Sequence, residues 1–123
     1  MAVRGIRGAT TAAGNTPDEI LEATRELLQA LVAANRLDPA EVASAIFTTS
    51  PDLTAEYPAA AARQLGWTET ALLGAAELAK PGGLPHCIRV LLHVNTDQPQ
   101  AAMRHVYLRG ARVLRPDREG ETL

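Results

Sequence analysis

Hydrophobic and polar residues alternate most regularly in the stretch CIRVLLHVNTD. Successive side chains of a strand point to opposite sides, so one face of this stretch is expected to be wholly apolar. The residues on that face are Ile88, Val90, Leu92 and Val94. The stretches AVRGIRGATT and VASAIFTTS also predict strands, and TALLGAAELA predicts a further extended segment. We therefore expect a sheet whose strands come from segments spread along the whole chain.

Two helix start signals lie between the first two predicted strands. In the first, Thr16 stands as N-cap, Pro17 at the first helical position and Glu19 three residues after the cap. Apolar residues then repeat at helical spacing up to about Asn35, which predicts one amphipathic helix. The second signal, DPAE, leads directly into the strand VASAIFTTS.

The remaining segments predict shorter elements. A short Ala-rich helix is expected from about Pro58 and ends at Gly66, KPGGLP is typical of a turn, and TDQP begins a turn or short helix. The stretch HVYLRGARVLRPD predicts a strand, a turn and a second strand. This order favours an α+β domain in which a mixed sheet carries its helices on one face. We expect residues 1–117 to form one domain and residues 118–123 to form a flexible tail.

Composition fits one domain with a modest core. The chain has 123 residues, of which 46% are hydrophobic and only four are aromatic. A core built from Ala, Val, Leu and Ile buries little area per residue, and such domains often depend on oligomerisation. The single cysteine, Cys87, excludes an internal disulfide, no apolar run reaches the roughly 18 residues of a membrane span, and no signal-peptide pattern is present. We expect a cytoplasmic protein with no membrane partner.

The charge balance argues against a nucleic-acid partner, because the net charge is −2 where a basic excess would be expected. Eleven of the twelve cations are nevertheless arginine, and Lys80 is the only lysine. Arginine suits forked, two-point contacts with carboxylates, although a GC-rich genome would also favour it. The position of each arginine must therefore show which of them serve function.

Arg89 is the only charged residue between Pro85 and Asn95, in the strand whose other face is apolar. One interpretation is an edge or solvent-facing arginine. The other is a partly buried cation that must be paired and awaits an anionic or oxygen-rich ligand. Glu77 likewise stands alone in ALLGAAELA, either as a solvated carboxylate at a strand end or as a ligand-binding partner of Arg89.

Arg7 lies between Gly5 and Gly8, two residues that are uncommon inside strands. Their backbone freedom could bring Arg7 close to a ligand held by Arg89 and Glu77. A simple β-bulge is the alternative explanation.

Other catalytic patterns find little support. The sequence has no HExxH or CxxC motif, and its three histidines are scattered singly, which argues against a metal site. Ser44 and Ser50 lack a nucleophile-elbow context, and Cys87 lies in an apolar strand that favours a packing role. Arginines without a general base or a nucleophile indicate electrostatic catalysis or plain anion binding.

Several stretches of the chain, in the same order and at similar spacing, resemble one family. They are RGIRGATT, TPDEIL, PDLTAEYPAAAAR, GGLPHCIRV and RHVYL followed by VLRPD. They cover nearly all of residues 3–117 and resemble the monofunctional bacterial chorismate mutases of the trimeric pseudo-α/β-barrel type. The resemblance implies a homotrimer with active sites at the subunit interfaces. It also implies conversion of chorismate to prephenate, the branch step toward phenylalanine and tyrosine, with no cofactor.

The resemblance assigns roles residue by residue. Arg89 corresponds to the ligand of the substrate's ether oxygen, and Glu77 to the carboxylate that meets the ring hydroxyl. Arg7 and Tyr107 correspond to the groups that hold the side-chain carboxylate of the substrate. Tyr57, Ala59 and Arg63 correspond to the segment that closes the pocket from the neighbouring subunit. Leu72 and Leu73 correspond to the apolar wall of the pocket, and Arg115 to a tail arginine at its mouth.

The chain departs from the family pattern at two positions, where Ala60 and Gly74 stand in place of an expected lysine and an expected cysteine. A lysine at the first position would add attraction for a dianion. Two alternatives stay open from the residues, namely a trimeric module that binds small carboxylates and an imine deaminase of related architecture. The Glu77 and Arg89 pair is the discriminating feature, because a simple carboxylate sensor has no need for the glutamate.

Overall fold

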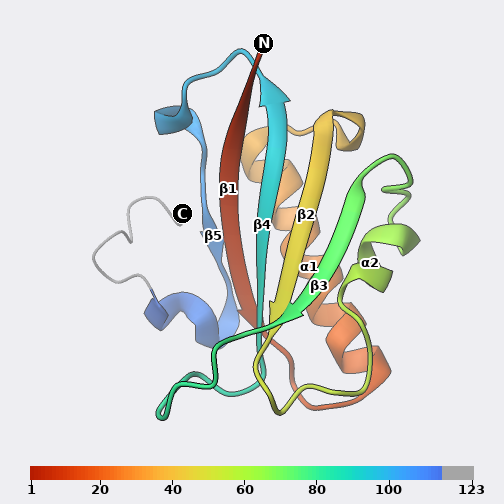
Figure 1. The fold of residues 1–123 in the computed structure, drawn as a ribbon, viewed down its shortest axis with the longest axis vertical. Helices are drawn as coiled ribbons and strands as arrows, with labels where there is room; N and C mark the ends of the chain where they lie inside the picture. Colours follow the sequence, from red (N-terminus) through yellow and green to blue (C-terminus); the bar gives the residue numbers. More distant parts are fainter. Residues whose placement is uncertain (115–123) are drawn as a thin grey trace.

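The computed structural model describes residues 1–114, and these form a single five-stranded sheet with helices on one side (Figure 1). The sheet order is β3-β2-β4-β1-β5. The strands are β1 (Ala2–Thr11), β2 (Val42–Thr49), β3 (Ala71–Ala76), β4 (Cys87–Thr96) and β5 (Val106–Tyr107). β4 is antiparallel to β1 and β2, whereas the β2–β3 and β1–β5 pairs are parallel. The predicted mixed sheet is confirmed.

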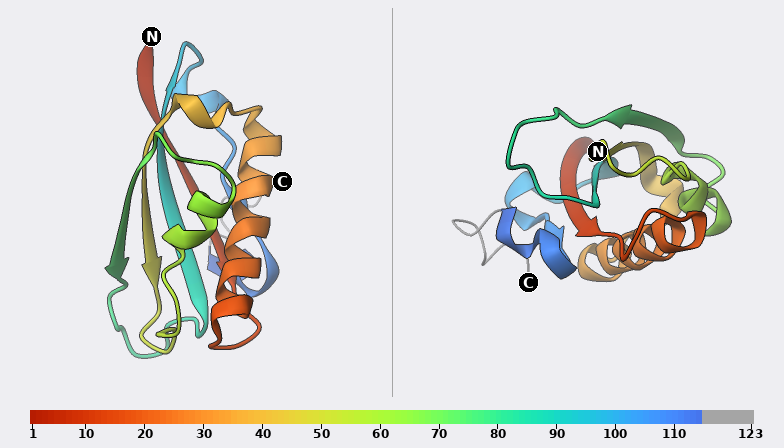
Figure 2. Two further views of the ribbon diagram at one scale, coloured as in Figure 1. Left: turned by 90° about the vertical axis from the view of Figure 1, so that its right-hand side faces the viewer. Right: turned by 90° about the horizontal axis from the view of Figure 1, so that it is seen from below.

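The two α-helices are crossover connections that lie on the same face of the sheet (Figure 2). Parallel strands cannot be joined by a tight hairpin, so α1 (Pro17–Asn35) connects β1 to β2 and α2 (Ala59–Gln64) connects β2 to β3. The guanidinium of Arg25 in α1 donates to Oε1 of Gln64 in α2 at 2.6 Å. Three short 3₁₀ helices complete the described elements: η1 (Pro39–Glu41), η2 (Gln100–Ala102) and η3 (Arg109–Leu114).

The start and end of α1 follow from its terminal residues. The Thr16 hydroxyl accepts from the backbone N–H of Glu19 at 3.2 Å, and Pro17 occupies the first turn, as predicted. Arg36 ends the helix in the left-handed conformation, with φ 52° and its N–H bonded to the carbonyl of Val32. The same logic holds at Asp38, whose carboxylate accepts from the N–H of Ala40 and caps η1.

Gly8 lies under α1, and its small size explains how closely the helix approaches the sheet. A Cβ at this position would lie 2.8 Å from Leu31 Cδ1 and 3.2 Å from Leu27 Cδ1. The pairing of β1 with β4 runs without interruption from Ala2 to Thr11, so no bulge is present. The β-bulge is therefore wrong as an explanation, and Gly8 serves helix–sheet packing.

The second strand expected within HVYLRGARVLRPD is also wrong for the described residues, because Arg109–Leu114 form η3. Arg109 has φ 51°, and its guanidinium Nη1 donates to the carbonyl of Thr11 while Nε lies 3.1 Å from Glu26 Oε1. The N–H of Gly110 donates to the Thr11 hydroxyl. These contacts turn the chain back over the end of β1 instead of extending the sheet edge.

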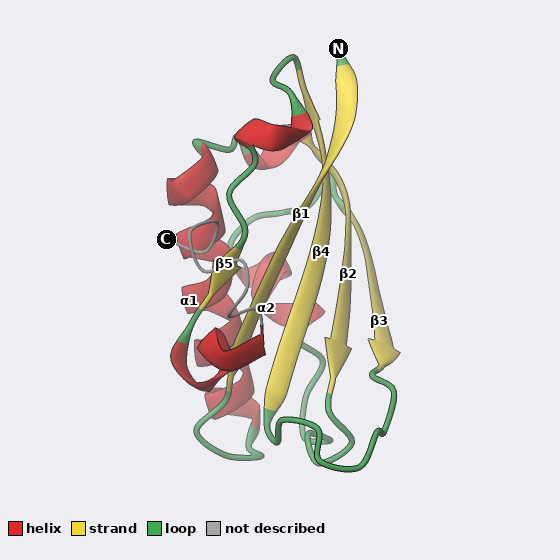
Figure 3. Cartoon of the chain, turned by 90° about the vertical axis from the view of Figure 1, so that its left-hand side faces the viewer, coloured by secondary structure: helices red, strands yellow, loops and turns green. Residues whose placement is uncertain are grey.

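One face of the sheet is covered by α1 and α2; on the other face, the described residues place no α-helix and only η3 packs near Ala9 and Tyr107 (Figure 3). The covered face holds the core, which includes Ile6, Phe47 and Leu92, all at most 1% exposed. Residues of opposite parity point to the other face, and these include Arg7 and Arg89, which are only partly buried. Every candidate residue for ligand binding on β1 and β4 therefore lies on the uncovered face.

Candidate active site

A cavity of about 350 Å³ lies on the uncovered face, where β5, β1, β4 and β2 run side by side. The side chains that can make polar contacts in it are Arg7, Thr48, Glu77, Arg89 and Tyr107. Ile46, Leu91 and Leu114 add apolar surface. Four of the residues predicted from the sequence, Arg7, Glu77, Arg89 and Tyr107, thus meet in one cavity.

Strand register brings these residues together. Arg89 on β4 pairs with Ala9 of β1 on one side and with Thr48 of β2 on the other. Tyr107 of β5 also pairs with Ala9, and Arg7 precedes Ala9 by two residues on the same face. Because paired residues project to the same side of a sheet, the four strands deliver their side chains to one point.

Glu77 and Arg89 form an ion pair that lines the cavity. Arg89 Nε lies 3.2 Å from Glu77 Oε1, and the two side chains are 41% and 32% exposed. The same Nε is buried and has no well-aligned hydrogen-bond acceptor among the described residues. Since Nε itself is buried, a ligand can reach the Arg89 side chain only through the part that stays exposed.

Arg7 is anchored through its backbone. Its N–H donates to Nδ1 of His105 at 2.9 Å, so the imidazole nitrogen takes the place of a strand carbonyl just before β5 begins. His105 and Tyr107 are both 8% exposed. The buried ring therefore holds the main chain at the residue whose guanidinium lines the cavity.

Cys87 opens β4 and is 2% exposed. Burial raises the pKa of its thiol, and the positive charge of Arg89 opposes that shift. The burial of Cys87 agrees with the expected packing role, although the residue also borders a cavity that Glu77 and Arg89 line. Residues 1–114 contain no group of three or more side chains arranged to hold a metal ion, and no helix among them has the length and apolarity needed to cross a membrane.

The other predicted site residues lie apart from this cavity. Tyr57 is 74% exposed and lines a separate cavity with Gly74 and Ala75 at the edge of the sheet. Ala59 and Leu72 pack against the hydrophobic core. Leu73 is 61% exposed on β3, and Arg63 is exposed on α2. Arg115 lies outside the described residues.

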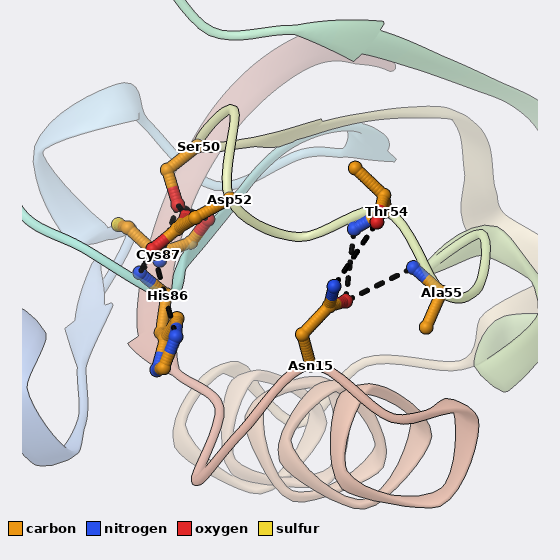
Figure 4. A network of polar contacts seen from close by, with 7 residues as sticks. All are labelled: Asn15, Ser50, Asp52, Thr54, Ala55, His86 and Cys87. Carbon is orange, nitrogen blue, oxygen red and sulfur yellow. Dashed lines mark hydrogen bonds and ion pairs between the residues drawn. The ribbon is translucent and has the colours of Figure 1, made fainter.

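Polar contacts hold the loop that carries Tyr57 (Figure 4). Asn15 Oδ1 accepts from the N–H groups of Thr54 and Ala55 at 2.9 and 3.0 Å, and its Nδ2 donates to the Thr54 hydroxyl at 3.0 Å. The side-chain amide of a residue before α1 thus takes up backbone donors of a loop that belongs to no strand.

The start of the same loop is bonded to the start of β4. The Ser50 hydroxyl accepts from Cys87 N–H at 2.9 Å and donates to the Asp52 carboxylate, whose oxygens also accept from the N–H of His86. The Ser50 hydroxyl, helped by the N–H and charge of His86, lowers the pKa of Asp52. This network connects the loop 51–57 to the strand that carries Arg89.

Thr48 is a cavity residue that sequence reasoning missed. Its hydroxyl donates to Glu77 Oε1 at 2.7 Å. The alternation along β2 indicates that Thr48 points to the face opposite the buried Phe47. Only the pairing of Thr48 with Arg89 shows that its hydroxyl enters the cavity.

The side chains in this cavity are suited to binding an anionic ligand that also carries a hydroxyl group. Two arginines and a tyrosine can bind anionic or ether oxygens, and a carboxylate can accept a hydrogen bond from a ligand hydroxyl. No cysteine or histidine is among the described residues that line this cavity, so it offers fixed charges rather than an activated thiol. Such an arrangement suits an enzyme that binds an anionic substrate and stabilises developing charge.

Comparisons with known proteins agree on one family. Residues 3–118 match the family described as chorismate mutase type I. Chorismate mutase AroH of Thermus thermophilus is 53% identical over 118 residues, which cover 95% of this chain and 97% of that protein. Chorismate mutase AroH of Bacillus subtilis (strain 168) is 45% identical over 118 residues, covering 95% and 93%.

A solved structure supports the same assignment. Chorismate mutase from Clostridium thermocellum superposes with a TM-score of 0.87 at 50% identity, covering 89% of this chain and 97% of that one. The fold is therefore the pseudo-α/β-barrel fold of these enzymes. The chain belongs to the chorismate mutase type I family.

Proposed function

We propose that this chain converts chorismate to prephenate in the cavity lined by Arg7, Glu77, Arg89 and Tyr107. The carrying observation is the Glu77–Arg89 pair, which lines one cavity together with Arg7 and Tyr107. The reaction is an intramolecular rearrangement in which an ether C–O bond breaks while a new C–C bond forms. No proton transfer or covalent intermediate is needed, which suits a pocket of fixed charges.

Two physical effects remain for such a site to supply. The first is to hold the flexible substrate in its compact reactive conformation, for which two carboxylates and a ring hydroxyl offer handles. Arg7 and Tyr107 bind the side-chain carboxylate, and Glu77 accepts from the ring hydroxyl. The second is to stabilise the negative charge that grows on the ether oxygen, which the Arg89 guanidinium does because it is already oriented when the charge appears.

The active unit is a homotrimer in this proposal, with Tyr57 and Arg63 of one copy completing the cavity of the next. The uncovered sheet face supports assembly, since the apolar side chain of Leu73 is 61% exposed on it and that of Val3 is 57% exposed. Tyr57 and Arg63 lie apart from the Arg89 cavity within one chain, which supports their serving the cavity of a neighbouring copy. The cytoplasmic location expected from the sequence stays a prediction.

A carboxylate-binding module and an imine deaminase are the less favoured functions. A sensor of simple carboxylates gains nothing from Glu77, whose charge would repel its ligand. Loss of chorismate absorbance on addition of the purified protein, with prephenate as the product, tests the catalytic assignment. Absence of turnover in a folded sample contradicts it.

Mixing two inactive variants tests the shared site. Arg89→Ala and Arg63→Ala each damage every site of a pure trimer. In an equal, random mixture, a site is intact when one subunit supplies Arg89 and its neighbour supplies Arg63, so roughly one site in four should recover. The measurement is activity after the two variants are refolded together, compared with each refolded alone. Size-exclusion chromatography confirms trimers, and mass tags confirm subunit exchange. Exchanged trimers with no gain in activity contradict a site shared between subunits.

A further inference from the structure

Glu77 lies between two cavities. It lines the 350 Å³ cavity with Thr48 and Arg7, and it also lines a neighbouring cavity of about 250 Å³ with Lys80 and Asp52. Arg89 is shared by both cavities, whereas Thr48 lines only the first of the two and Lys80 only the second. The direction in which the Glu77 carboxylate points therefore decides which cavity it serves.

Few contacts fix that carboxylate. Glu77 follows β3, an edge strand whose residues are mostly exposed, and its backbone N–H donates to the carbonyl of Thr49 at 3.0 Å. Beyond that backbone bond, its side chain has two partners among the described residues, the Thr48 hydroxyl at 2.7 Å and Arg89 Nε at 3.2 Å. Both partners meet the same oxygen, Oε1. The other oxygen, Oε2, is left to accept from a ligand.

Of these two partners, only Thr48 distinguishes the cavities. Arg89 borders both, so its charge attracts the carboxylate in either direction. Lys80 is an exposed cation that borders the second cavity together with Glu77, on the side away from Thr48. The Thr48 hydroxyl is a short, directed donor on a central strand, and a β-branched side chain keeps few rotamers there.

We propose that Thr48 is a positioning residue that holds Glu77 in the Arg7 cavity, against the pull of Lys80. This rests on the proposed function for the role of Glu77 toward the substrate hydroxyl. Without the Thr48 hydroxyl the carboxylate turns toward Lys80, and the substrate loses its acceptor while Arg89 stays in place.

The test compares Thr48→Val, which removes the hydroxyl at nearly constant shape, with Thr48→Ser, which keeps it. We expect Thr48→Val to lower kcat/KM about tenfold, because one charge-assisted hydrogen bond is lost, and Thr48→Ser to stay within about twofold of the unmodified chain. In a Glu77→Ala background, Thr48→Val should change kcat/KM no further. An unchanged Thr48→Val variant, or an equal loss in the Glu77→Ala background, overturns the proposal.

Lys80→Ala supplies the matched control. Alone it should leave kcat/KM unchanged, and combined with Thr48→Val it should recover part of the loss, because the competing cation is gone. A combination as impaired as Thr48→Val alone argues that Lys80 does not compete and overturns that part of the proposal.

A crystal structure of Thr48→Val gives a readout that needs no turnover. The Glu77 carboxylate within about 4 Å of Lys80 Nζ supports the positioning role. The carboxylate unmoved beside Arg89 overturns it. If the unmodified chain fails to consume chorismate, the proposed function fails separately, and this structural result still decides the role of Thr48.

Discussion

The residues around Arg89 and the residues around Tyr57 are held by different kinds of contact. Arg89, Arg7 and Tyr107 stand on paired strands, where the backbone ladder sets the position of each side chain. Tyr57 stands on a loop outside the sheet, and side chains such as Asn15 replace the ladder by binding loop backbone groups (Figure 4). The backbone that carries Arg7, Arg89 and Tyr107 is therefore fixed by strand pairing, whereas the backbone of the Tyr57 loop depends on a few side-chain hydrogen bonds.

The difference matters because the proposed function gives the two halves of the site, the residues around Arg89 and the Tyr57 loop, different roles. In the proposed mechanism, stabilising charge on an ether oxygen needs a guanidinium fixed before the charge appears, and Arg89 stands on the central strand β4. Closing a pocket against solvent tolerates a loop that adjusts. Substitutions should therefore separate the halves by the size and kind of their effect.

Arg89→Lys should cause the largest loss. Lysine keeps the charge but lacks the planar fork, so we expect the activation free energy to rise by about 3 kcal/mol or more, with the fold intact. Steady-state turnover of chorismate measures this, and circular dichroism reports the fold. Arg104→Lys is the matched control, because Arg104 is exposed and lines a different cavity. Near-normal turnover of Arg89→Lys contradicts its assigned role.

Gly8→Ala should mainly cost stability. The added methyl group meets Leu31 at 2.8 Å, so α1 or its side chains must shift, and overpacking of this kind costs about 1–3 kcal/mol. Thermal melting measures the change. Gly74→Ala on β3 is the control, since nothing lies within 4 Å of a Cβ there. Equal melting temperatures for the two variants would show that close packing of α1 is not the reason for Gly8.

Asn15→Ala tests the loop half. It removes three hydrogen bonds from Thr54 and Ala55, so we expect kcat/KM to fall about tenfold, mostly through a higher KM, while the fold is kept. Chorismate kinetics measure the split between kcat and KM. A fall in kcat alone contradicts a role in presenting Tyr57.

Mixed trimers show which pocket Asn15 serves. Co-refolding Asn15→Ala with Arg89→Ala should restore about one site in four, because the loop of one variant completes the intact Arg89 site of the other. Co-refolding it with Arg63→Ala should give no gain over separate samples, since both changes damage the same half. Gain in the second mixture but not in the first would place Asn15 with the Arg89 half.

Asp52 should give the smallest effect, and it depends on pH. Because the Ser50 hydroxyl lowers the pKa of Asp52 in the folded chain, the ionised carboxylate adds stability above the unfolded pKa of about 3.9. That stability is lost as the pH falls through the lower, folded pKa. The difference in free energy of unfolding between the unmodified chain and Asp52→Asn should therefore be constant near neutrality and shrink in acid. Urea unfolding at fixed protein concentration measures it, and a difference that grows in acid contradicts the assignment.

Local sequence patterns determined where the helices start and which face of β4 packs in the core. The Thr16 cap and Pro17 set the start of α1, and Asp38 caps η1, because a capping contact involves residues only two or three positions apart. The alternation from Ile88 to Val94 set the core face of β4, since strand side chains alternate whatever their neighbours are. Arg89 and Glu77 stood out individually as charges within apolar stretches.

Tertiary structure decided which of these residues meet. Thr48, Glu77 and Arg89 come from different segments, and only the register of β2 against β3 and β4 brings the hydroxyl and the guanidinium to one carboxylate oxygen. Tertiary contacts also explain two other residues. Gly8 is needed because α1 packs closely over it, and the bonds of Arg109 to Thr11 and Glu26 accompany η3 where the sequence predicted a strand. Register and helix approach are set by packing between segments tens of residues apart, and no local pattern in a single segment encodes them.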